Sequence, residues 1–446
     1  MSSTSRSRSS RDVTRPNSLD GIISVPGDKS ISHRSLILNA IAYGDALVQG
    51  LSGGDDVLST MHCLQAMGVT IEPTGQAGSY SVIGRGPQLV EPSDILNAGN
   101  SGTSIRLLSG ILAAQPFVSV ITGDSSLRTR PMQRILDPLG QMGAQIMGRH
   151  ENTLAPLVFR GGNLRGIEYD LPMASAQVKS AIMLAGLFAS SETVIHQPAL
   201  SRDHTERMLS AMGGKVKKDG LNLTVLPTEL KAVNITVPGD ISSASFWIVA
   251  GLCHPNAQIM VRGVGLNPSR TGIIDVLQDM RAGDALQLLN QRNEGGEPVA
   301  DILVTSAELH GTEIGGDMIP RMLDEVPILA VAACFAIGDT VIRDAAELRV
   351  KESDRIATTV SELTRLGADI EATADGMIIH GRGPGEATLE GAECESHTDH
   401  RLAMSMAVAG LLANGKTTVH GALDASVSYT ELWQDLDILK LSLIHI

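Results

Sequence analysis

Residues 328–370, ILAVAACFAIGDTVIRDAAELRVKESDRIATTVSELTRLGADI, contain one complete structural unit. Residues 328–336 are apolar enough for a buried helix, and the β-branched segment 340–343 predicts a short strand. The charged segment 350–355, VKESDR, then opens an amphipathic helix. That helix closes at Leu366-Gly367, where the glycine is a helix C-cap and a strand follows. The stretch therefore predicts helix, strand, charged turn, helix and strand in succession.

The same order of elements occurs six times from Ile22 onward. The apolar helices are expected to start near Ser30, Ser101, Ser175, Ser242, Asp324 and Asp399. The strands that follow them are expected at Ala46–Val48, Val118–Ile121, Thr193–Ile195, Gln258–Val261, Thr340–Ile342 and Thr417–Val419. The repeat spacing of roughly 65 to 80 residues is too long for a thin solenoid. Six α/β repeats in this length predict two domains of three repeats each.

Two near-identical segments, SVPGD at 24–28 and TVPGD at 236–240, mark the expected crossovers between these domains. We predict one domain over residues 27–240, with repeats one to three. A discontinuous second domain is predicted over 16–26 plus 241–440, with repeats four to six. Residues 1–15 are rich in Ser and Arg and are predicted to be a disordered tail. Residues 291–298, QRNEGGEP, are predicted to be a surface loop.

Composition excludes several classes of function. The chain has 446 residues, of which 43% are hydrophobic and 2% aromatic, so its cores must be aliphatic. A net charge of −14 argues against binding to nucleic acid or to anionic membranes. The four cysteines are far apart, which favours reduced thiols and a cytoplasmic protein. No apolar run is long enough to predict a membrane span.

Cations recur at the starts of predicted helices, most of them apolar, although the protein is acidic overall. They are found in GDKSISHR (27–34), NAGNSGTSIR (97–106), SAQVKS (175–180), VKESDR (350–355) and HTDHR (397–401). Any one of these segments is most often a simple cap or a solvated turn. Together they predict one site for small ligands with several negative charges, because helix N-termini and arginine forks both bind such groups. The carboxylates among these cations could act as acid and base.

Other chemistries have weaker support. His397 and His400 lie at i, i+3 spacing, but no thiol or second histidine motif accompanies them, so a structural role is favoured over metal ligation. No Walker loop, dinucleotide fingerprint or G-x-S-x-G elbow is present.

Eight motifs in this order resemble those of the 5-enolpyruvylshikimate-3-phosphate (EPSP) synthase family. They are PGDKSISHR, LNAGNSGTSIRLL, GDSSLRTRPM, SAQVKSA, SRDHTE, DEVPILAVAA, ELRVKESDRI and TDHRLAMS. The resemblance covers about residues 19–436 and does not extend to residues 440–446. It implies the enolpyruvyltransferase fold, a two-domain inside-out α/β barrel. That fold has six βαβαββ-type repeats, three per domain, with the active site in the interdomain cleft.

The resemblance also implies a reaction. The enolpyruvyl group of phosphoenolpyruvate passes to the 5-hydroxyl of shikimate 3-phosphate by addition and elimination, with release of phosphate and without a cofactor or metal. This step belongs to chorismate and aromatic amino-acid biosynthesis. A cytoplasmic monomer is expected, with glyphosate as an inhibitor. GDKS, SAQVK and RDHTE resemble the class II subgroup associated with glyphosate tolerance, whereas Gly102 stands where tolerant members carry Ala.

The family's functional residues match positions of this chain. The resemblance implies Asp324 as general base and Glu352 as proton donor, with Lys29 close to both steps. Phosphoenolpyruvate would be bound by Lys29, Gly102, Arg130, Gln177, Arg355 and Arg401. Shikimate 3-phosphate would be bound by Lys29, Ser30, Arg34, Ser175, Ala176, Gln177, Arg202, Asp324 and Lys351.

Three alternatives remain to be weighed. A sister enzyme that acts on UDP-N-acetylglucosamine carries a Cys in the loop that corresponds to residues 124–130, where this chain has none. A non-catalytic sensor of an anionic metabolite would need the cations but not Asp324 and Glu352. A purely structural repeat protein would leave the cations without a role.

Overall fold

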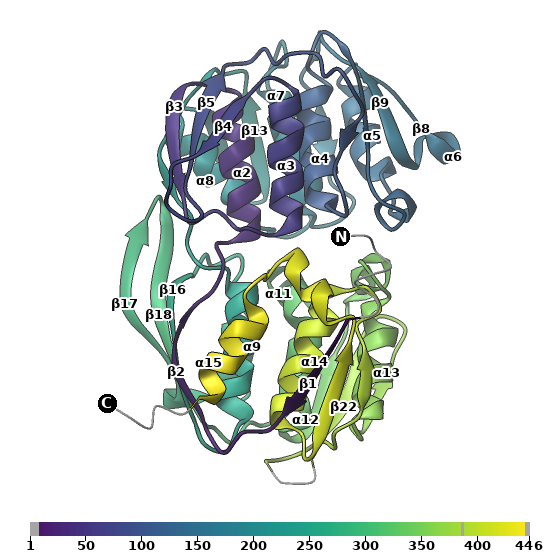
Figure 1. Ribbon diagram of the computed structural model, residues 1–446. Helices are drawn as coiled ribbons and strands as arrows, with labels where there is room; N and C mark the ends of the chain where they lie inside the picture. The colour runs from purple at the N-terminus through teal and green to yellow at the C-terminus, as the bar shows by residue number, and fades with distance from the viewer. Residues whose placement is uncertain (1–8, 385–387, 442–446) are drawn as a thin grey trace. The chain divides into compact units, whose positions relative to one another are not determined.

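The structure is a computed structural model that describes residues 9–384 and 388–441. The chain divides into two compact units, and Figure 1 labels many of their helices and strands. The first unit is Gly27–Val237 with Glu294–Gly296. The second unit comprises the described residues up to Pro26, Pro238–Asn293 and the described residues from Glu297 onward. The chain passes between the units at the two Pro-Gly-Asp segments.

The first unit contains three repeats. Repeat one is α2 (Lys29–Ala40), β3 (Ala42–Gln49), α3 (Asp55–Ala66), β4 (Thr70–Pro73) and β5 (Tyr80–Arg85). Repeat two is β6 (Leu96–Asn97), α4 (Gly102–Leu112), β7 (Val118–Thr122), η1 (Leu127–Thr129), α5 (Gln133–Gln141), β8 (Gln145–Gly148), α6 (Arg149–Asn152) and β9 (Leu154–Arg160). Repeat three is β10 (Glu168–Asp170), α7 (Ala176–Gly186), β11 (Thr193–His196), α8 (His204–Ala211), β12 (Lys215–Asp219) and β13 (Asn222–Leu226), followed by β14 (Leu230–Lys231) and β15 (Ile235–Thr236).

The second unit begins with β1 (Ser10–Thr14) and β2 (Leu19–Ser24). Repeat four is α9 (Ile241–Cys253), β16 (Ala257–Gly265), α10 (Gly272–Asp279), η2 (Gly283–Ala285), β17 (Leu286–Glu294) and β18 (Glu297–Thr305). Repeat five is β19 (Glu313–Ile314), η3 (Gly316–Met318), α11 (Ile319–Met322), η4 (Leu323–Glu325), α12 (Val326–Cys334), β20 (Ile337–Ile342), η5 (Ala346–Val350), α13 (Arg355–Arg365), β21 (Ile370–Ala372) and β22 (Met377–Arg382). Repeat six is β23 (Glu393–Glu395), α14 (His400–Leu412), β24 (Lys416–His420), η6 (Ala422–Val427) and α15 (Leu432–Lys440).

The sheets share one topology. In repeat three the order is β10-β11-β13-β12, with β10 and β11 parallel and the other pairs antiparallel. Repeats two and five repeat this pattern with β6-β7-β9-β8 and β19-β20-β22-β21. In each unit, a strand from outside the repeat also joins the sheet of the unit's first repeat. In the first unit β14 and β15 pair in parallel with β3, and in the second unit β2 pairs in parallel with β16.

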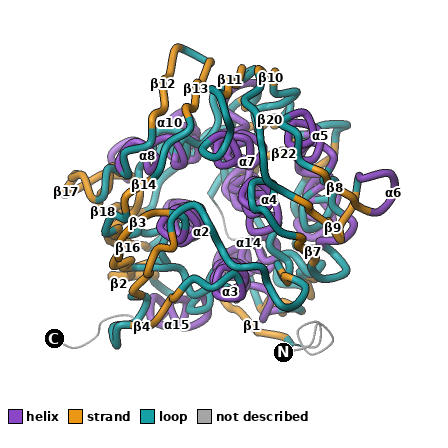
Figure 2. The backbone as a smooth tube through the Cα atoms, turned by 90° about the horizontal axis from the view of Figure 1, so that it is seen from above, coloured by secondary structure: helices purple, strands orange, loops and turns teal. Residues whose placement is uncertain are grey.

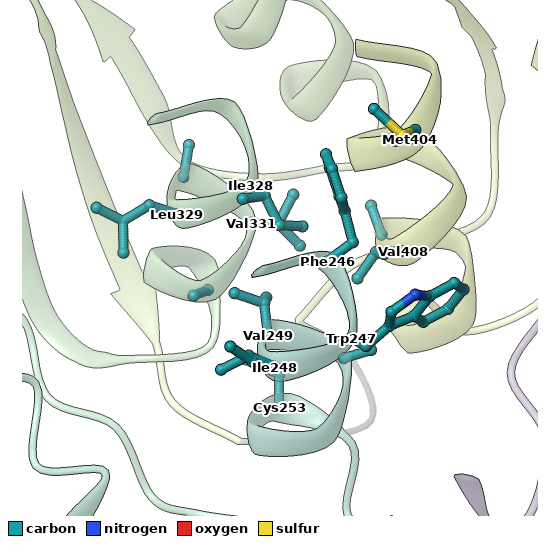
Figure 3. Close-up of a cluster of buried hydrophobic side chains, with 14 of the residues drawn as sticks. Phe246, Trp247, Ile248, Val249, Cys253, Ile328, Leu329, Val331, Met404 and Val408 are labelled. Carbon is teal, nitrogen blue, oxygen red and sulfur yellow. The ribbon is translucent and has the colours of Figure 1, made fainter. Parts of the chain in front are cut away.

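The apolar helices α2, α4 and α7 lie inward of the strands in the first unit (Figure 2). Helices α4 and α7 approach closely at Gly110, where a Cβ atom would lie 2.3 Å from the carbonyl oxygen of Ala181. Only glycine permits that approach. In the second unit α9, α12 and α14 form the corresponding core, in which Phe246, Val331 and Met404 lie close to one another (Figure 3). Burial on several sides explains why these helices are apolar around most of their circumference.

The predicted helix starts and strands agree with the observed elements to within a few residues. Ser101, Ser175 and Asp399 are the N-cap residues of α4, α7 and α14, and each side chain accepts a hydrogen bond from a backbone N–H. Asp324 precedes α12 and lies in η4. Every predicted strand lies inside an observed strand, which is longer at one or both ends.

The prediction of a disordered tail up to residue 15 is wrong for Ser10–Thr14. These residues form β1, which pairs antiparallel with β24 from Ser10–His420 to Thr14–Lys416. Strand β1 gives repeat six an antiparallel partner for β24, and Val13 is fully buried in the core. The remaining part of the predicted tail, residues 1–8, lies outside the described residues, as do residues 442–446.

The predicted surface loop at 291–298 is also wrong, because most of it belongs to a β-hairpin. Strands β17 and β18 meet at Gly295-Gly296, whose φ angles are 60° and 85°. Two consecutive residues with positive φ are typical of the tight turn that suits the twist of a hairpin. The polar composition of the segment reflects strand β17, which is mostly exposed.

Cys63, Cys253, Cys334 and Cys394 are buried free thiols. Among the described residues, no helix is both long and apolar enough to cross a membrane.

The buried position of Val13 yields a test of β1. Val13→Ala is expected to lower the free energy of unfolding by about 1–3 kcal/mol, because it removes buried apolar atoms from the core. Chemical denaturation measures this change. Thr14→Ala, on the exposed side of the same strand, serves as control and is expected to change stability by less than about 0.5 kcal/mol. Equal effects of the two substitutions would contradict the pairing of β1 in solution.

Candidate active site

The start of α2 holds a buried arginine in a fixed orientation. Arg34 Nε donates to Thr205 Oγ1 at 2.7 Å, and Nη2 donates to Ser180 Oγ at 2.8 Å. Arg34 Nη1 donates to the carbonyl oxygen of Ser30 at 2.9 Å, one helical turn back. Arg202 Nη1 lies 3.5 Å from Ser30 Oγ. Three predicted shikimate-3-phosphate residues, Ser30, Arg34 and Arg202, are therefore neighbours.

Lys29 opens α2 and lies beside the start of α3. Its Nζ contacts Asp56 Oδ2 at 3.0 Å. Asp28 caps the same helix, because its Oδ1 accepts from the backbone N–H of Ile31 at 2.8 Å. The partner Asp56 was not predicted from the sequence. Asp56 lies in the acidic first turn of α3, where the sequence alone indicates only a favourable interaction with the helix dipole.

A second group forms where α4 and α7 begin. Gln177 Oε1 accepts from Arg106 Nη1 at 2.5 Å, and Gln177 Nε2 donates to Thr103 Oγ1 at 3.0 Å. Arg130 Nη2 donates to Asn100 Oδ1 at 2.6 Å. A Cβ atom on Gly102 would lie 3.2 Å from Arg106 Nη1 and 3.4 Å from Arg130 Nη1. The predicted residues Gly102, Arg130 and Gln177 thus surround the N-terminus of α4, whose backbone N–H groups favour anions.

Ser175 and Ala176 complete the predicted set in the first unit. Ser175 caps α7 through its Oγ atom, which accepts from the backbone N–H of Val178 at 3.4 Å. Ala176 is the first residue of α7. Both residues lie directly before Gln177 at a helix N-terminus.

Arg355 is the central residue of the second unit's site, and only 1% of it is exposed. Its guanidinium contacts three carboxylates. Nε is 2.8 Å from Asp399 Oδ2, Nη2 is 2.6 Å from Glu352 Oε2, and Nη1 is 3.3 Å from Asp324 Oδ1. Burial lowers the pKa of Arg355, but Asp399 and Glu352 outweigh that effect and raise its pKa above the ordinary value. The guanidinium therefore stays charged and holds the predicted acid and base in one cluster.

Lys351 lies on the other side of Asp324. Its Nζ is 3.7 Å from Asp324 Oδ1. Burial lowers the pKa of Lys351, and the charge of Arg355 lowers it further, while Asp324 opposes both effects. Two cations, Lys351 and Arg355, therefore lie beside Asp324, the residue expected to accept a proton.

Arg401 is connected to this cluster through Asp399. The backbone N–H of Arg401 donates to Asp399 Oδ1 at 2.9 Å, and Nη1 donates to the carbonyl oxygen of Ser242 at 3.2 Å. The guanidinium also lies over the ring of Phe246, 5.9 Å from its centre. Asp399 thus caps α14, orients Arg401 and binds Arg355.

Several functional partners were not found by sequence reasoning. The sequence marks Asp399 only as a helix start, but the structure shows a fully buried carboxylate that binds Arg355 and Ser353. Arg106 and Asn100 lie in the quoted motif but were assigned no role. The signal for Asp399 in the sequence is a carboxylate that lies among cations at a helix cap. Such a carboxylate can be buried, because the cations supply the partners that a buried charge needs.

His397, in the HTDHR segment at 397–401, contacts a buried glutamate. His397 Nε2 contacts Glu362 Oε1 at 2.8 Å. Within residues 9–384 and 388–441, no group of three or more His, Cys, Asp or Glu side chains could hold a metal ion.

The family model for EPSP synthase (3-phosphoshikimate 1-carboxyvinyltransferase) matches residues 13–436. The chain belongs to the EPSP synthase family. It is 54% identical to the 3-phosphoshikimate 1-carboxyvinyltransferase of Herpetosiphon aurantiacus over 96% of this chain and 99% of that protein. It is 52% identical to the enzyme of the same name from Desulforamulus reducens over 92% of this chain and 95% of that protein.

Solved structures agree with this membership in the EPSP synthase family. The EPSP synthase of Acinetobacter baumannii superimposes with a TM-score of 0.86 at 45% identity, over 97% of this chain and 98% of that one. The enolpyruvyl transferase NikO from Streptomyces tendae superimposes with a TM-score of 0.75 at 17% identity, over 96% of both chains. The likeness to NikO concerns the fold alone. The predicted enolpyruvyltransferase fold is therefore confirmed.

The buried Arg355–Asp399 pair yields a stability test. Asp399→Asn is expected to lower the free energy of unfolding by about 3 kcal/mol, because it removes a charge partner from a buried guanidinium. Denaturant titration measures the change. The matched control is Asp12→Asn, which breaks the exposed Asp12–Lys416 pair and should cost less than about 1 kcal/mol. If the two substitutions cost the same, the pair is not buried in solution as described.

Proposed function

We propose that this chain is a 3-phosphoshikimate 1-carboxyvinyltransferase that uses phosphoenolpyruvate and shikimate 3-phosphate as substrates. The observation that carries the proposal is the contact of Arg355 with both Asp324 and Glu352, in a chain that matches the family along almost its whole length. Anion binding alone does not require carboxylates among the cations. Acid–base chemistry does require them.

Phosphoenolpyruvate brings a phosphate and a carboxylate, both of which need cations. We assign these groups to Lys29, Arg130, Arg355 and Arg401, with Gly102 and Gln177 beside them. The planar guanidinium fork suits both anions, because it can donate two parallel hydrogen bonds. Support comes from the buried arginines, whose orientations are fixed by hydrogen bonds before any ligand arrives.

Shikimate 3-phosphate brings a second phosphate, a second carboxylate and the attacking hydroxyl. We assign its binding to Lys29, Ser30, Arg34, Ser175, Ala176, Gln177, Arg202, Asp324 and Lys351. The neighbouring positions of Ser30, Arg34 and Arg202 support a phosphate subsite there. The contact between Lys351 and Asp324 supports a role for both residues near the hydroxyl that reacts.

The proposed reaction has two steps. In the first, Asp324 takes the proton of the 5-hydroxyl as its oxygen bonds to C2 of phosphoenolpyruvate, and Glu352 gives a proton to C3. In the second, Glu352 takes a proton back from C3 while the bond from C2 to the phosphate oxygen breaks, which restores the double bond. The proton on Asp324 then leaves with the phosphate. Lys29 stabilises negative charge during both steps.

We further propose that the protein acts as a cytoplasmic monomer and that glyphosate inhibits it. The class II motifs favour tolerance of glyphosate, whereas Gly102 favours sensitivity because it has no methyl group to crowd the inhibitor. The two guanidinium groups near the position of a Gly102 Cβ make this residue the point where crowding would act.

The direct test is phosphate release from phosphoenolpyruvate. We expect release that depends on shikimate 3-phosphate, does not occur with UDP-N-acetylglucosamine, and falls when glyphosate is added. Release with UDP-N-acetylglucosamine alone would favour the sister enzyme. Binding of shikimate 3-phosphate without release would favour a non-catalytic sensor.

Substitution of the proposed base tests the chemistry. Asp324→Asn is expected to lower kcat by about 10²–10⁴-fold, because the amide cannot accept the hydroxyl proton. Steady-state kinetics measures kcat, and calorimetry measures the affinity for shikimate 3-phosphate. Asp275→Asn, which breaks the partly exposed ion pair with Arg321, is the control and should leave kcat unchanged. A nearly normal kcat for Asp324→Asn would exclude this residue as the base.

The lowered pKa of Lys351 predicts a dependence of binding on pH. As the pH rises through that pKa, the ammonium loses its charge before an ordinary lysine with a pKa of 10.5 would. The affinity for anionic shikimate 3-phosphate should therefore fall at alkaline pH. In Lys351→Arg the fall should move to higher pH, because a guanidinium stays charged. Calorimetric titrations between about pH 7 and about pH 10 test this, and identical pH profiles for the two proteins would contradict it.

A further inference from the structure

A buried ion pair lies behind the candidate phosphate subsite of the first unit. Lys179 of α7 is 1% exposed, and its Nζ lies 2.6 Å from Glu206 Oε1 of α8. Because the ammonium is buried, it is not available to contact a substrate. Burial of such a pair seldom adds net stability, because desolvation of two charges offsets their attraction. The pair therefore calls for another physical reason.

The same ammonium holds the segment that connects β11 to α8. Lys179 Nζ donates to the carbonyl oxygen of Ser201 at 3.3 Å and to Gln197 Oε1 at 3.1 Å. Ser201 Oγ donates to the same Gln197 oxygen at 3.2 Å. Residues 197–203 form neither helix nor strand, so these side-chain contacts, rather than a regular ladder, fix their path.

A second contact joins α7 and α8 beside this ion pair, one residue further along α7 and one residue back along α8. Ser180 Oγ and Thr205 Oγ1 are 2.7 Å apart, next to Lys179 and Glu206 respectively. Both hydroxyls also accept from Arg34. Ser180 and Thr205 therefore fix the position of Arg34 relative to α7 and α8. The neighbouring contacts of Lys179 hold the 197–203 segment.

Arg202 lies in the chain between the two positions that Lys179 holds. Ser201 precedes it directly and Glu206 follows four residues later, and both contact the Lys179 ammonium. An ammonium has three donors, which match the three acceptors on Glu206, Gln197 and Ser201. A neutral apolar side chain of similar length could fill the space but could not hold the Ser201 carbonyl.

We propose that Lys179, together with Glu206, is a positioning residue that holds Arg202 in place for the phosphate group of shikimate 3-phosphate. This inference rests on the proposed function, in which Arg202 binds that substrate. Lys179 acts through Arg202 and not on the reacting atoms. It therefore determines how strongly the enzyme prefers a phosphorylated over an unphosphorylated acceptor.

The first variant is Lys179→Met. We expect the KM for shikimate 3-phosphate to rise on the order of tenfold, because a charge-assisted contact to the phosphate loses its geometry. The KM for phosphoenolpyruvate and kcat should change less than about twofold. With shikimate, which lacks the phosphate, kcat/KM should be the same for variant and wild type. A purely structural role would not produce this selective loss.

A double-mutant cycle separates positioning from independent effects. Arg202→Ala alone should raise the KM for shikimate 3-phosphate, and adding Lys179→Met to it should raise that KM no further. Additive effects of the two substitutions would overturn the proposal. Phe159→Leu, in the core strand β9 of the same unit, is the control for general destabilisation, and it should leave the ratio of the two acceptor efficiencies unchanged.

Unpaired Glu206 could prevent folding of Lys179→Met, so a second variant removes both charges. Lys179→Met/Glu206→Leu should fold, since apolar replacement of a buried pair is often neutral for stability. It should show the same selective rise in KM. An active wild type with an unchanged KM in this folded variant would overturn the positioning role alone. A wild type that releases no phosphate with shikimate 3-phosphate would instead overturn the proposed function.

Discussion

The contact between Arg355 and Asp399 determines how the site of the second unit is built. A buried guanidinium is costly unless carboxylates surround it, and Asp399 supplies two of its contacts. Arg355 also contacts Glu352 through Nη2, the atom that donates to Asp399 Oδ1, and it contacts Asp324 through Nη1. Asp399 simultaneously caps α14 and binds the backbone of Arg401. One ion pair therefore fixes the positions of a proposed acid, a proposed base and two proposed anion-binding arginines.

The first unit orients its buried arginine in a different way. Thr205, Ser180 and the Ser30 carbonyl donate no charge to the contact but orient the Arg34 guanidinium through uncharged oxygens. Such a group suits a phosphate with two negative charges. Arg355 is instead held by carboxylates, which suits a place where protons must move.

In both units, a strand from a distant part of the chain completes a sheet, and the order of the repeats alone does not require that pairing. Strands β14 and β15 complete the sheet of β3 at the end of the first unit, and β2 completes the sheet of β16 in the second. The chain passes between the units at Pro26-Gly27 and at Val237-Pro238. At each crossover an aspartate follows and caps the next inner helix, Asp28 for α2 and Asp240 for α9. The duplicated segments combine a turn with a helix start.

Local sequence determined the repeats, the inner helices and the strands, because periodicity, caps and β-branched runs act over a few residues. The motifs also supplied the residues that are proposed for the candidate site. Strand β1 was not predictable in this way, since Val13 becomes core only through pairing with β24, which lies far along the chain. The partners Asp56, Asp399 and Glu206 are equally non-local. From the sequence alone, an isolated carboxylate is interpreted as a helix cap or a solvated charge. Only tertiary packing decides which cation it pairs with and whether the pair is buried.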